Sequence, residues 1–358
     1  MISKCRHLID LNDYPPSFWD GIIALAKTIK EDPAIYSQKC AGKIMGTLFY
    51  EPSTRTQMSF QTAMLRLGGG IIGFDNPETS SVAKGENLKD TTKIISSYAD
   101  IMVMRHPSEG SAKAAALTAD CPIINAGDGG HLHPTQTLTD LLTLSEKKGG
   151  LTGLTVGLCG DLMNGRTVHS LLKALSCYKN NTFVLISTPE LQLPSYIKDL
   201  LNASCSSFTE VTSLEEAIPA LDVLYMTRIQ KERFSSEEEY YAQKDVYVLD
   251  KKKLQKAKKD LCILHPLPRV DEIAIEVDDD PRALYFEQAK NGVYVRMALI
   301  LTILEINQPS QLLFGQVHSN LTCSNRRCIT HRESYLPKSF VGSGDMLECE
   351  YCDERVLI

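Results

Sequence analysis

The sequence has 358 residues, of which 43% are hydrophobic and 23% charged, and its formal net charge is −6. Its length predicts two or three domains of ordinary globular composition. The negative charge argues against nucleic acid or an anionic membrane as a partner, since both attract basic surfaces. The N-terminus lacks an apolar signal core, and the longest apolar run, at 297–304, is far too short to span a bilayer. We therefore expect a cytoplasmic protein.

Between residues 44 and 125, short β-rich runs alternate with helix-patterned segments. The runs are continuously apolar, which is typical of parallel strands covered on both faces. The expected strands are 44–50, 71–74, 101–104 and 122–125, and the expected helices are 58–67 and 88–98. A helix predicted to begin at Pro134 and to stop at Gly149 follows, and we expect it to connect two domains.

A second α/β series follows that helix. Its expected strands are 154–159, 183–187, 223–226, 246–249 and 261–264, and a long helix is expected at 281–306. The predicted fold class is therefore α/β, with two doubly wound parallel-sheet domains joined by long helices. The polar segment 307–310 indicates a linker to a different C-terminal region.

The segment EPSTRT at 51–56 lies between an apolar strand and an amphipathic helix. Three hydroxyls, the Arg55 guanidinium and the free amides of a helix N-terminus would converge there, which suits a phosphate group. The alternative is that these hydroxyls only cap the helix. The hydroxyls are those of Ser53, Thr54 and Thr56.

Polar side chains recur after the C-terminal ends of strands, where open α/β sheets bind ligands. One such residue alone is more often a cap or a surface group, but here the placement repeats at five strand ends. The residues are Arg105 and His106, then His133 and Gln136, then Arg166, then Arg228 and Gln230, and finally the segment 265–269.

Several common chemistries find no support. No G-x4-G-K-[S/T] loop exists, and the glycines at 157 and 160 do not complete a dinucleotide fingerprint. No Ser-His-Asp order, H-E-x-x-H motif or paired-carboxylate arrangement stands out. The predicted site is cationic and polar, suited to holding two anions and polarising a carbonyl group without a protein nucleophile.

Four of the eleven cysteines fall within the last 36 residues, as C-x4-C followed by C-x2-C. This pairing is typical of a structural zinc site with four thiolates, in a small β-rich domain that the metal helps to fold. Unligated cysteines are the bland alternative. A nucleic-acid-binding zinc ribbon is a weaker one, because acidic residues offset the nearby arginines. The expected ligands are Cys323, Cys328, Cys349 and Cys352.

Taken together, six motifs resemble the aspartate carbamoyltransferase family, in order over about residues 5–306. They are EPSTRT at 51–56, VMRHP at 103–107, HPTQT at 133–137, GD at 160–161 with GRTVHS at 165–170, YMTRIQKER at 225–233 and HPLPRVDE at 265–272. The resemblance implies transfer of a carbamoyl group from carbamoyl phosphate to L-aspartate, the committed step of pyrimidine synthesis, with no metal needed for the step.

The resemblance also implies residue roles. Ser53, Thr54, Arg55 and Thr56 would hold the phosphate, while Arg105, Thr56 and His133 would polarise the carbonyl oxygen and Gln136 would hold the carbamoyl NH2 group. Arg166 and Arg228 would hold the two carboxylates of aspartate, with Gln230 and the Leu267 carbonyl aiming its amine. The Leu267-Pro268 bond is expected to be cis, Glu51 to tie Arg166 to Arg233 as the domains close, and Glu232 to steady Arg228.

The loop at 79–85, alone, is an ordinary Ser/Gly surface loop. In the family, the residues that correspond to Ser80 and Lys84 reach into the neighbouring subunit's site, which implies a homotrimer with shared active sites. Ala83 and Gln57 stand where some relatives carry lysine and arginine, so the charge of this loop is expected to differ.

Two other functions remain open. Ornithine carbamoyltransferase shares the phosphate motif, but Pro266 stands where that family usually has cysteine, and two arginines suit a dicarboxylate better than a cationic amine. A catalytically inactive α/β scaffold with a zinc interaction module is the other alternative.

The tail resembles the zinc domain of the regulatory chain of the bacterial enzyme, down to CITH at 328–331. Too few residues precede the cysteines for that chain's nucleotide-binding domain, so we expect a fusion that does not respond to CTP or ATP. The expected domains are 1–133 with 287–306 for carbamoyl phosphate, 134–149 as the connecting helix, 150–286 for aspartate, and 307–358 as linker and zinc domain.

Overall fold

The structure is a computed structural model that describes residues 2–3, 6–229, 236, 238, 240, 243, 246–306, 308–344 and 346–357. The chain divides into two compact units, one formed by residues 1–135 and 293–358 and the other by residues 136–292. Within the described residues, no helix has both the length and the apolar character required to cross a membrane.

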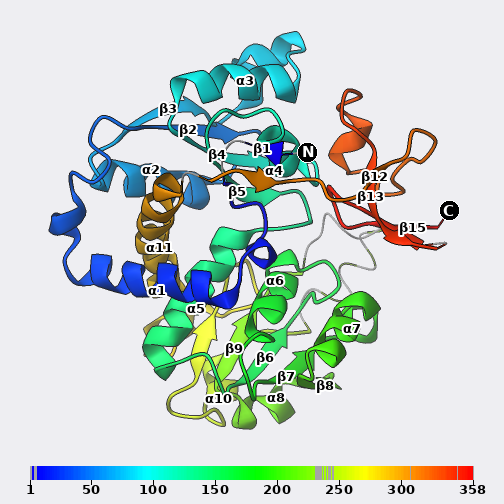
Figure 1. The fold of residues 1–358 in the computed structure, drawn as a ribbon. Coiled ribbons are helices and arrows are strands. Elements are labelled where there is room, and N and C mark those ends of the chain that lie inside the picture. The colour runs from blue at the N-terminus through cyan, green and yellow to red at the C-terminus, as the bar shows by residue number, and fades with distance from the viewer. Residues whose placement is uncertain are drawn as a thin grey trace. The chain divides into compact units, whose positions relative to one another are not determined.

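The first unit is built on a parallel four-stranded sheet (Figure 1). Its strands follow the order β3 (Gly70–Phe74), β2 (Ile44–Phe49), β4 (Ile101–His106) and β5 (Ile123–Asp128). The central strand β4 and the edge strand β5 are buried at every position. Burial on both faces explains the apolar run with which each strand begins.

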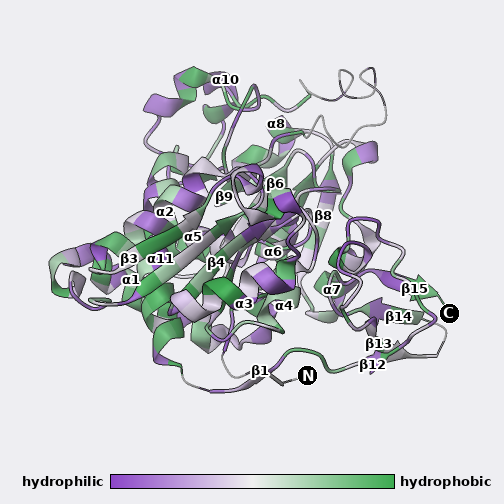
Figure 2. Ribbon diagram, turned by 90° about the horizontal axis from the view of Figure 1, so that it is seen from above, coloured by the Kyte–Doolittle hydropathy of each residue, from purple (hydrophilic) through white to green (hydrophobic). Residues whose placement is uncertain are grey.

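Among its described residues, the first unit has four α-helices before the end of β5, of which the last three contact the sheet. They are α1 (Pro16–Glu31), α2 (Thr54–Arg66), α3 (Leu88–Tyr98) and α4 (Ser111–Ala116). The long helix α11 (Tyr285–Glu305) packs against α2 through Arg296. The Arg296 guanidinium carbon lies 4.9 Å from the centre of the Phe60 ring. Figure 2 shows hydrophobic residues along the central strands, as the burial of β4 requires.

The second unit has a parallel five-stranded sheet. Its strands follow the order β10 (Cys262–Leu264), β9 (Val223–Met226), β6 (Thr155–Cys159), β7 (Thr182–Ile186) and β8 (Ser207–Val211). Its helices are α6 (Arg166–Leu175), α7 (Ser195–Ala203), α8 (Leu214–Ala217) and α10 (Lys251–Leu254), together with most of α5 (Pro134–Lys148) and the first part of α11.

The C-terminal region, which belongs to the first unit, is a small antiparallel sheet. Its strands follow the chain order β12 (Gln316–Val317), β13 (Ser339–Ser343), β14 (Met346–Cys349) and β15 (Arg355–Leu357). Before it, β11 (Ser310–Gln311) pairs antiparallel with β1 (Ile2–Ser3) at the other end of the chain.

The predicted fold class is confirmed, with two parallel-sheet α/β units and a small β region at the C-terminus. One predicted strand is wrong: residues 246–249 contribute only an isolated bridge from Leu249 to Ile273. The fifth strand is instead β8, an edge strand with an exposed and polar pattern that carries no apolar run. The finer division into domains at 133, 149, 286 and 307 stays a prediction.

Candidate active site and metal centre

The predicted phosphate segment lies where β2 ends and α2 begins. Ser53 occupies the N-cap position of α2, yet its hydroxyl makes no capping hydrogen bond. Thr54, Arg55 and Thr56 form the first turn, in which the backbone amides have no partner within the helix. The simple capping alternative therefore does not describe Ser53, and the segment presents hydroxyls and amides suited to a phosphate.

Arg105 ends β4 and is 9% exposed. Its Nη2 lies 3.1 Å from Glu51 Oε2, and its Nη1 donates to the Ala126 carbonyl at 3.3 Å. Burial lowers the pKa of Arg105, and the Glu51 carboxylate opposes that shift. Burial also lowers the pKa of Arg55, and the positive charge of Arg105 lowers it further. The two positive guanidinium groups therefore repel each other, and a bound anion would reduce this repulsion.

The space beside Gly127 is bordered by both Arg105 and His133. A Cβ at Gly127, where φ is +120°, would lie 2.9 Å from Arg105 Nη1 and 3.5 Å from His133 Cδ2. His133 is 6% exposed, and the Thr135 hydroxyl lies 3.4 Å from its Nδ1. The first unit thus brings together two of the side chains predicted to polarise a carbonyl oxygen.

His106, also predicted at a strand end, has a structural role. Its Nδ1 accepts a hydrogen bond from the Ser108 amide at 2.9 Å, and its ring lies 4.7 Å from that of Tyr50. Burial lowers the pKa of His106 to about 4, so the ring is neutral at physiological pH.

The loop that carries Ser80 and Lys84 folds as two short 3-10 helices. The Ser80 hydroxyl donates to the Pro77 carbonyl at 2.7 Å and accepts from the Val82 amide at 3.2 Å, so it caps the turn Ser81–Lys84. Lys84 is exposed. The predicted reach of both residues into a neighbouring subunit stays a prediction.

In the second unit, Arg166 and Arg228 follow neighbouring strands. Arg166 opens α6 after β6, and Arg228 follows β9 by two residues; the two strands pair with Cys159 opposite Met226. The Asp161 carboxylate accepts from the Asn164 amide at 2.9 Å and so shapes the turn before α6. Two half-buried cationic groups therefore extend from adjacent strand ends, as a dicarboxylate would require.

The loop after β10 presents Leu267. The bond to Pro268 is cis, as predicted, and Leu267 has a φ of +54°. The His265 Nδ1 accepts a hydrogen bond from the Leu267 amide at 2.8 Å, and the His265 Nε2 lies 2.7 Å from Glu272 Oε1. Burial alone would raise the pKa of Glu272. The hydrogen bond and the charge interaction with His265, together with hydrogen bonds from backbone amides, outweigh burial and lower the pKa. The sequence placed His265 among the polar residues at strand ends but gave Glu272 no role, although Glu272 lies in the quoted motif.

A second missed residue is Asp140, four positions after Gln136 on α5. The Gln136 amide nitrogen donates to Asp140 Oδ1 at 2.8 Å, and Gln288 Nε2 donates to the same oxygen at 2.6 Å. The Tyr225 hydroxyl donates to the other oxygen at 3.1 Å. With its nitrogen bound in this way, the amide oxygen is the end of Gln136 suited to accept from an NH2 group. The i, i+4 spacing was the available signal.

Some predicted residues lie outside the description. Gln230, Glu232 and Arg233 are not among the described residues. The expected link from Glu51 to Arg166 and Arg233 also stays a prediction, and in this structure Glu51 pairs with Arg105.

The four C-terminal cysteines converge. The Sγ atoms of Cys323, Cys328, Cys349 and Cys352 all lie within 4.8 Å of one another, and all four residues are buried. The Cys323–Cys352 and Cys328–Cys349 sulfur distances are 3.5 and 3.8 Å. A tetrahedral ion with sulfur ligands at about 2.3 Å places its ligands about 3.8 Å apart. The residues present therefore fit a four-coordinate metal with thiolate ligands.

This cysteine region packs on the first sheet. One hydrophobic cluster joins Met104, Ala112 and Ile123 to Ile329 and Tyr351. Polar contacts add to it. The Leu88 amide donates to Glu333 Oε1 at 3.1 Å, Lys113 Nζ to the Glu350 carbonyl at 2.6 Å, and the Ile329 amide to the Glu109 carbonyl at 2.9 Å. The region is thus bound to the body of its own chain.

Comparisons with known proteins agree with this organisation. Residues 6–146 match the family described as aspartate/ornithine carbamoyltransferase, carbamoyl-P binding domain, and residues 152–303 match the Asp/Orn binding domain of the same family. Residues 315–357 match the metal binding domain of the aspartate carbamoyltransferase regulatory chain.

The similar proteins described next are aspartate carbamoyltransferases, also called aspartate transcarbamoylases. The chain is 59% identical over 302 residues to an aspartate carbamoyltransferase catalytic subunit of Clostridium perfringens, covering 84% of this chain and 98% of the relative. The corresponding subunit of Clostridium novyi is 57% identical over 301 residues, with the same coverage. The catalytic subunit of M. jannaschii aspartate transcarbamoylase superimposes with a TM-score of 0.79 at 46% identity, covering 84% of this chain and 98% of that one. Aspartate transcarbamoylase from Trypanosoma cruzi, in complex with N-(phosphonacetyl)-L-aspartic acid, gives 0.79 at 37% identity, covering 84% and 96%.

With this fold and this set of strand-end residues, the chain is a carbamoyltransferase. It belongs to the aspartate/ornithine carbamoyltransferase family, on the aspartate side, and it carries in addition the metal-binding domain of a regulatory chain. The resemblance read from the six motifs is confirmed.

Proposed function

We propose that this chain transfers the carbamoyl group of carbamoyl phosphate to the α-amine of L-aspartate, in de novo pyrimidine synthesis. The observation that carries the proposal is the separation of cationic groups into two sets. Arg55 and Arg105 lie with phosphate-type hydroxyls in one unit, and Arg166 and Arg228 lie at adjacent strand ends in the other. Each set suits one anionic substrate of this reaction.

In the first step, Ser53, Thr54, Arg55 and Thr56 hold the phosphate, while Arg105, Thr56 and His133 donate to the carbonyl oxygen. Arg105 Nε is buried and has no partner among the described residues, so a bound oxygen atom would satisfy it. Charged Arg105 next to a buried imidazole provides donors that are in place before negative charge develops on the oxygen. The Gln136 amide oxygen holds the carbamoyl NH2 group.

In the second step, Arg166 and Arg228 hold the aspartate carboxylates, and Gln230 with the Leu267 carbonyl orients the uncharged amine. The amine nitrogen forms a bond to the carbonyl carbon, the bond from that carbon to the phosphate oxygen breaks, and the departing phosphate can accept the proton that the amine loses. Catalysis is then positional and electrostatic, and no protein nucleophile is needed.

For the four cysteines we propose structural Zn²⁺. The sulfur distances fit its radius, and four thiolates leave no coordination position open for a substrate. The small antiparallel sheet has little core of its own, so the metal would supply folding free energy. The region is a fusion of a regulatory-type domain to a catalytic chain, and we expect no response to CTP or ATP from the purified chain.

We further propose a cytoplasmic homotrimer with active sites shared between subunits, in which Ser80 and Lys84 serve the neighbouring site. Mixing inactive Lys84→Gln and His133→Ala chains should restore activity, because hybrid trimers contain sites that lack both substitutions. Hybrids without activity would show that each site is built within one chain.

The reaction is tested by turnover of carbamoyl phosphate with aspartate and with ornithine, with zinc content measured on the same sample. Turnover with aspartate is expected, together with one zinc per chain. Turnover with ornithine alone would establish the other member of the family, and no turnover with either amino acid would leave an inactive scaffold.

A further inference from the structure

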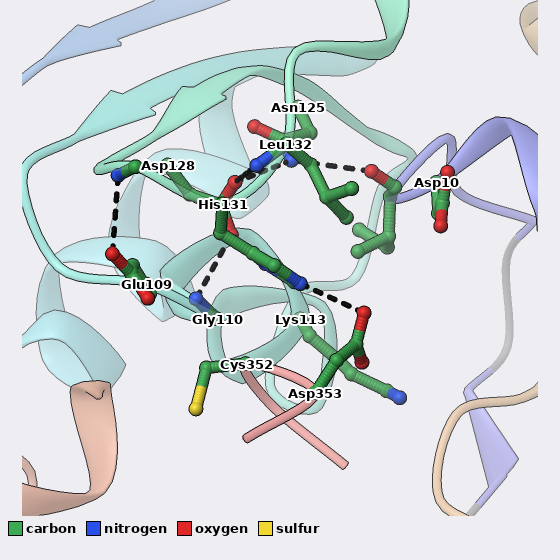
Figure 3. Close-up of polar contacts among 12 residues, drawn as sticks. Asp10, Glu109, Gly110, Lys113, Asn125, Asp128, His131, Leu132, Cys352 and Asp353 are labelled. Atoms are coloured by element: carbon green, nitrogen blue, oxygen red, sulfur yellow. Dashed lines mark hydrogen bonds and ion pairs between the residues drawn. The ribbon is translucent and has the colours of Figure 1, made fainter. Parts of the chain in front are cut away.

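The loop 127–133 comprises the last two residues of β5 and the connection to α5, and it is organised around one buried carboxylate. Asp128 is 1% exposed and accepts from the Gly110 amide at 2.8 Å, the Leu132 amide at 3.0 Å and Asn125 Nδ2 at 3.2 Å (Figure 3). The His131 Nδ1 lies 3.1 Å from Asp128 Oδ2. The loop's shape therefore depends on where Asp128 and His131 are held.

The same loop carries the carbonyl-polarising group. His133 follows Leu132 directly, and a Cβ added at Gly127 would lie 2.9 Å from Arg105 Nη1 and 3.5 Å from His133 Cδ2. A displacement of this segment would therefore move His133, one of the donors proposed to face the carbonyl oxygen.

His131 also reaches the metal-binding region. Its Nε2 lies 2.9 Å from Asp353 Oδ2, so the ring is held between two carboxylates (Figure 3). Burial would lower the pKa of His131, but Asp128 and Asp353 together raise it well above its usual value. Carboxylates only accept hydrogen bonds, so a ring placed between two of them donates from both nitrogens.

The position of Asp353 is set by the cysteine turn. Asp353 directly follows Cys352, its amide donates to the Cys349 carbonyl at 2.9 Å, and its φ is +58°. A second link runs in parallel. Glu109 accepts from the Gly130 amide at 3.2 Å and from Asn325 Nδ2 at 2.5 Å, so it too joins the loop to the cysteine region.

We propose that His131 is a positioning residue for the carbamoyl-transfer reaction, which holds the loop 127–133 and hence His133 in place by bridging Asp128 to Asp353 of the metal-binding region. This inference rests on the proposed role of His133. It gives the C-terminal region a part in catalysis through the geometry of its own chain, without any contact between that region and substrate.

The test uses the full-length, metal-loaded protein and two variants, Asp353→Asn and His131→Gln. Asparagine keeps the size of aspartate and tolerates a positive φ, so Asp353→Asn removes only the charge from the bridge. Lys113→Met is the matched control, because it removes another charged contact between the same two regions, at a place that does not touch the loop. Metal content and oligomeric state are measured for each protein.

The readouts are the affinity for phosphonoacetamide, a stable isostere of carbamoyl phosphate, by calorimetry, and kcat with saturating substrates. Both bridge variants should lose about 5-fold to 10-fold in each, as expected for a coupling at the low end of the usual range. The double variant should be no worse than His131→Gln, and Lys113→Met should resemble the unchanged protein. If His131 and Asp353 had only a structural role, their substitution would lower the melting temperature and leave both the affinity for phosphonoacetamide and kcat unchanged.

Coupling must also act in the reverse direction. Phosphonoacetamide should slow the loss of metal to a chelator in the unchanged protein and have a smaller effect in Asp353→Asn. Unaltered affinity and kcat in both metal-loaded bridge variants would overturn the proposal. That result would leave the proposed reaction intact, since turnover by the unchanged protein tests the reaction separately.

Discussion

Replacing Gly127 by alanine should impair catalysis far more than folding. The added Cβ would lie 2.9 Å from Arg105 Nη1, closer than neighbouring atoms allow, and 3.5 Å from His133 Cδ2. Because the backbone at Gly127 also packs in a buried strand, the guanidinium is the group that must move. Loss of one preset donor to a developing oxyanion typically lowers the rate by about 10²-fold to 10³-fold.

The folding cost should be smaller. A φ of +120° disfavours any L-residue, and backbone strain of this kind costs about 1–3 kcal/mol in the free energy of unfolding. Gly42→Ala is the matched control, since Gly42 lies in the same unit at a φ of +77° with nothing within 4 Å of its hypothetical Cβ. It carries backbone strain without the contact to Arg105.

Steady-state kinetics and chemical denaturation of both variants provide the assay. Gly127→Ala should lose at least about 10²-fold in kcat/KM for carbamoyl phosphate, while Gly42→Ala stays within about 2-fold, because only the first displaces a donor. Equal kinetics for the two variants would refute the idea that Gly127 is required for the placement of Arg105 and His133.

Three further predictions concern the pH response, the metal and aspartate. Burial lowers the pKa of His7 to about 4, and its Nδ1 accepts the Ile123 amide at 3.0 Å. Between pH 6.5 and 4 the unfolded chain binds a proton that the folded protein does not, so His7 makes stability fall by about 3 kcal/mol as pH decreases through this window. His7→Gln should flatten that part of the profile in urea titrations, and an unchanged slope would contradict it. Chelation of the metal should raise hydrogen exchange in β13, β14 and α4, and full protection in the metal-free protein would show that the cysteines do not support the region. Arg166→Lys or Arg228→Lys should raise the KM for aspartate about 10-fold to 100-fold, since lysine lacks the planar fork. Affinity for phosphonoacetamide should be retained in both variants. Loss of this affinity together with the rise in KM would show that these arginines do not serve the aspartate carboxylates alone.

Local signals in the sequence were sufficient where one segment determines the feature. Ser53 to Thr56 and the four cysteines each lie in a short motif whose chemistry can be recognised without the rest of the chain. The cis bond before Pro268 was expected only from the family resemblance. Continuous apolar runs also identified most of the parallel strands, because burial on both faces imposes that composition.

Features that depend on distant partners could not be read in this way. The apolar residues Tyr247 and Leu249 indicated a strand but are buried against neighbouring elements without joining a sheet, whereas β8 is a true strand with an exposed edge. The bond from Asp140 to Gln288 joins residues 148 positions apart. No periodicity records such a contact, and the same holds for the bridge from His131 to Asp353.

The C-terminal region is joined to the rest of the chain by residues 308–315 and by the pairing of β1 with β11. This connection makes its contact with the first sheet independent of the protein concentration. A binding module on the same polypeptide meets its surface at an effective concentration in about the millimolar range, set by the connecting segment and not by the amount of protein. Dilution that would separate two chains therefore leaves this contact in place. The metal-binding region should remain seated on its catalytic body even where the protein is scarce.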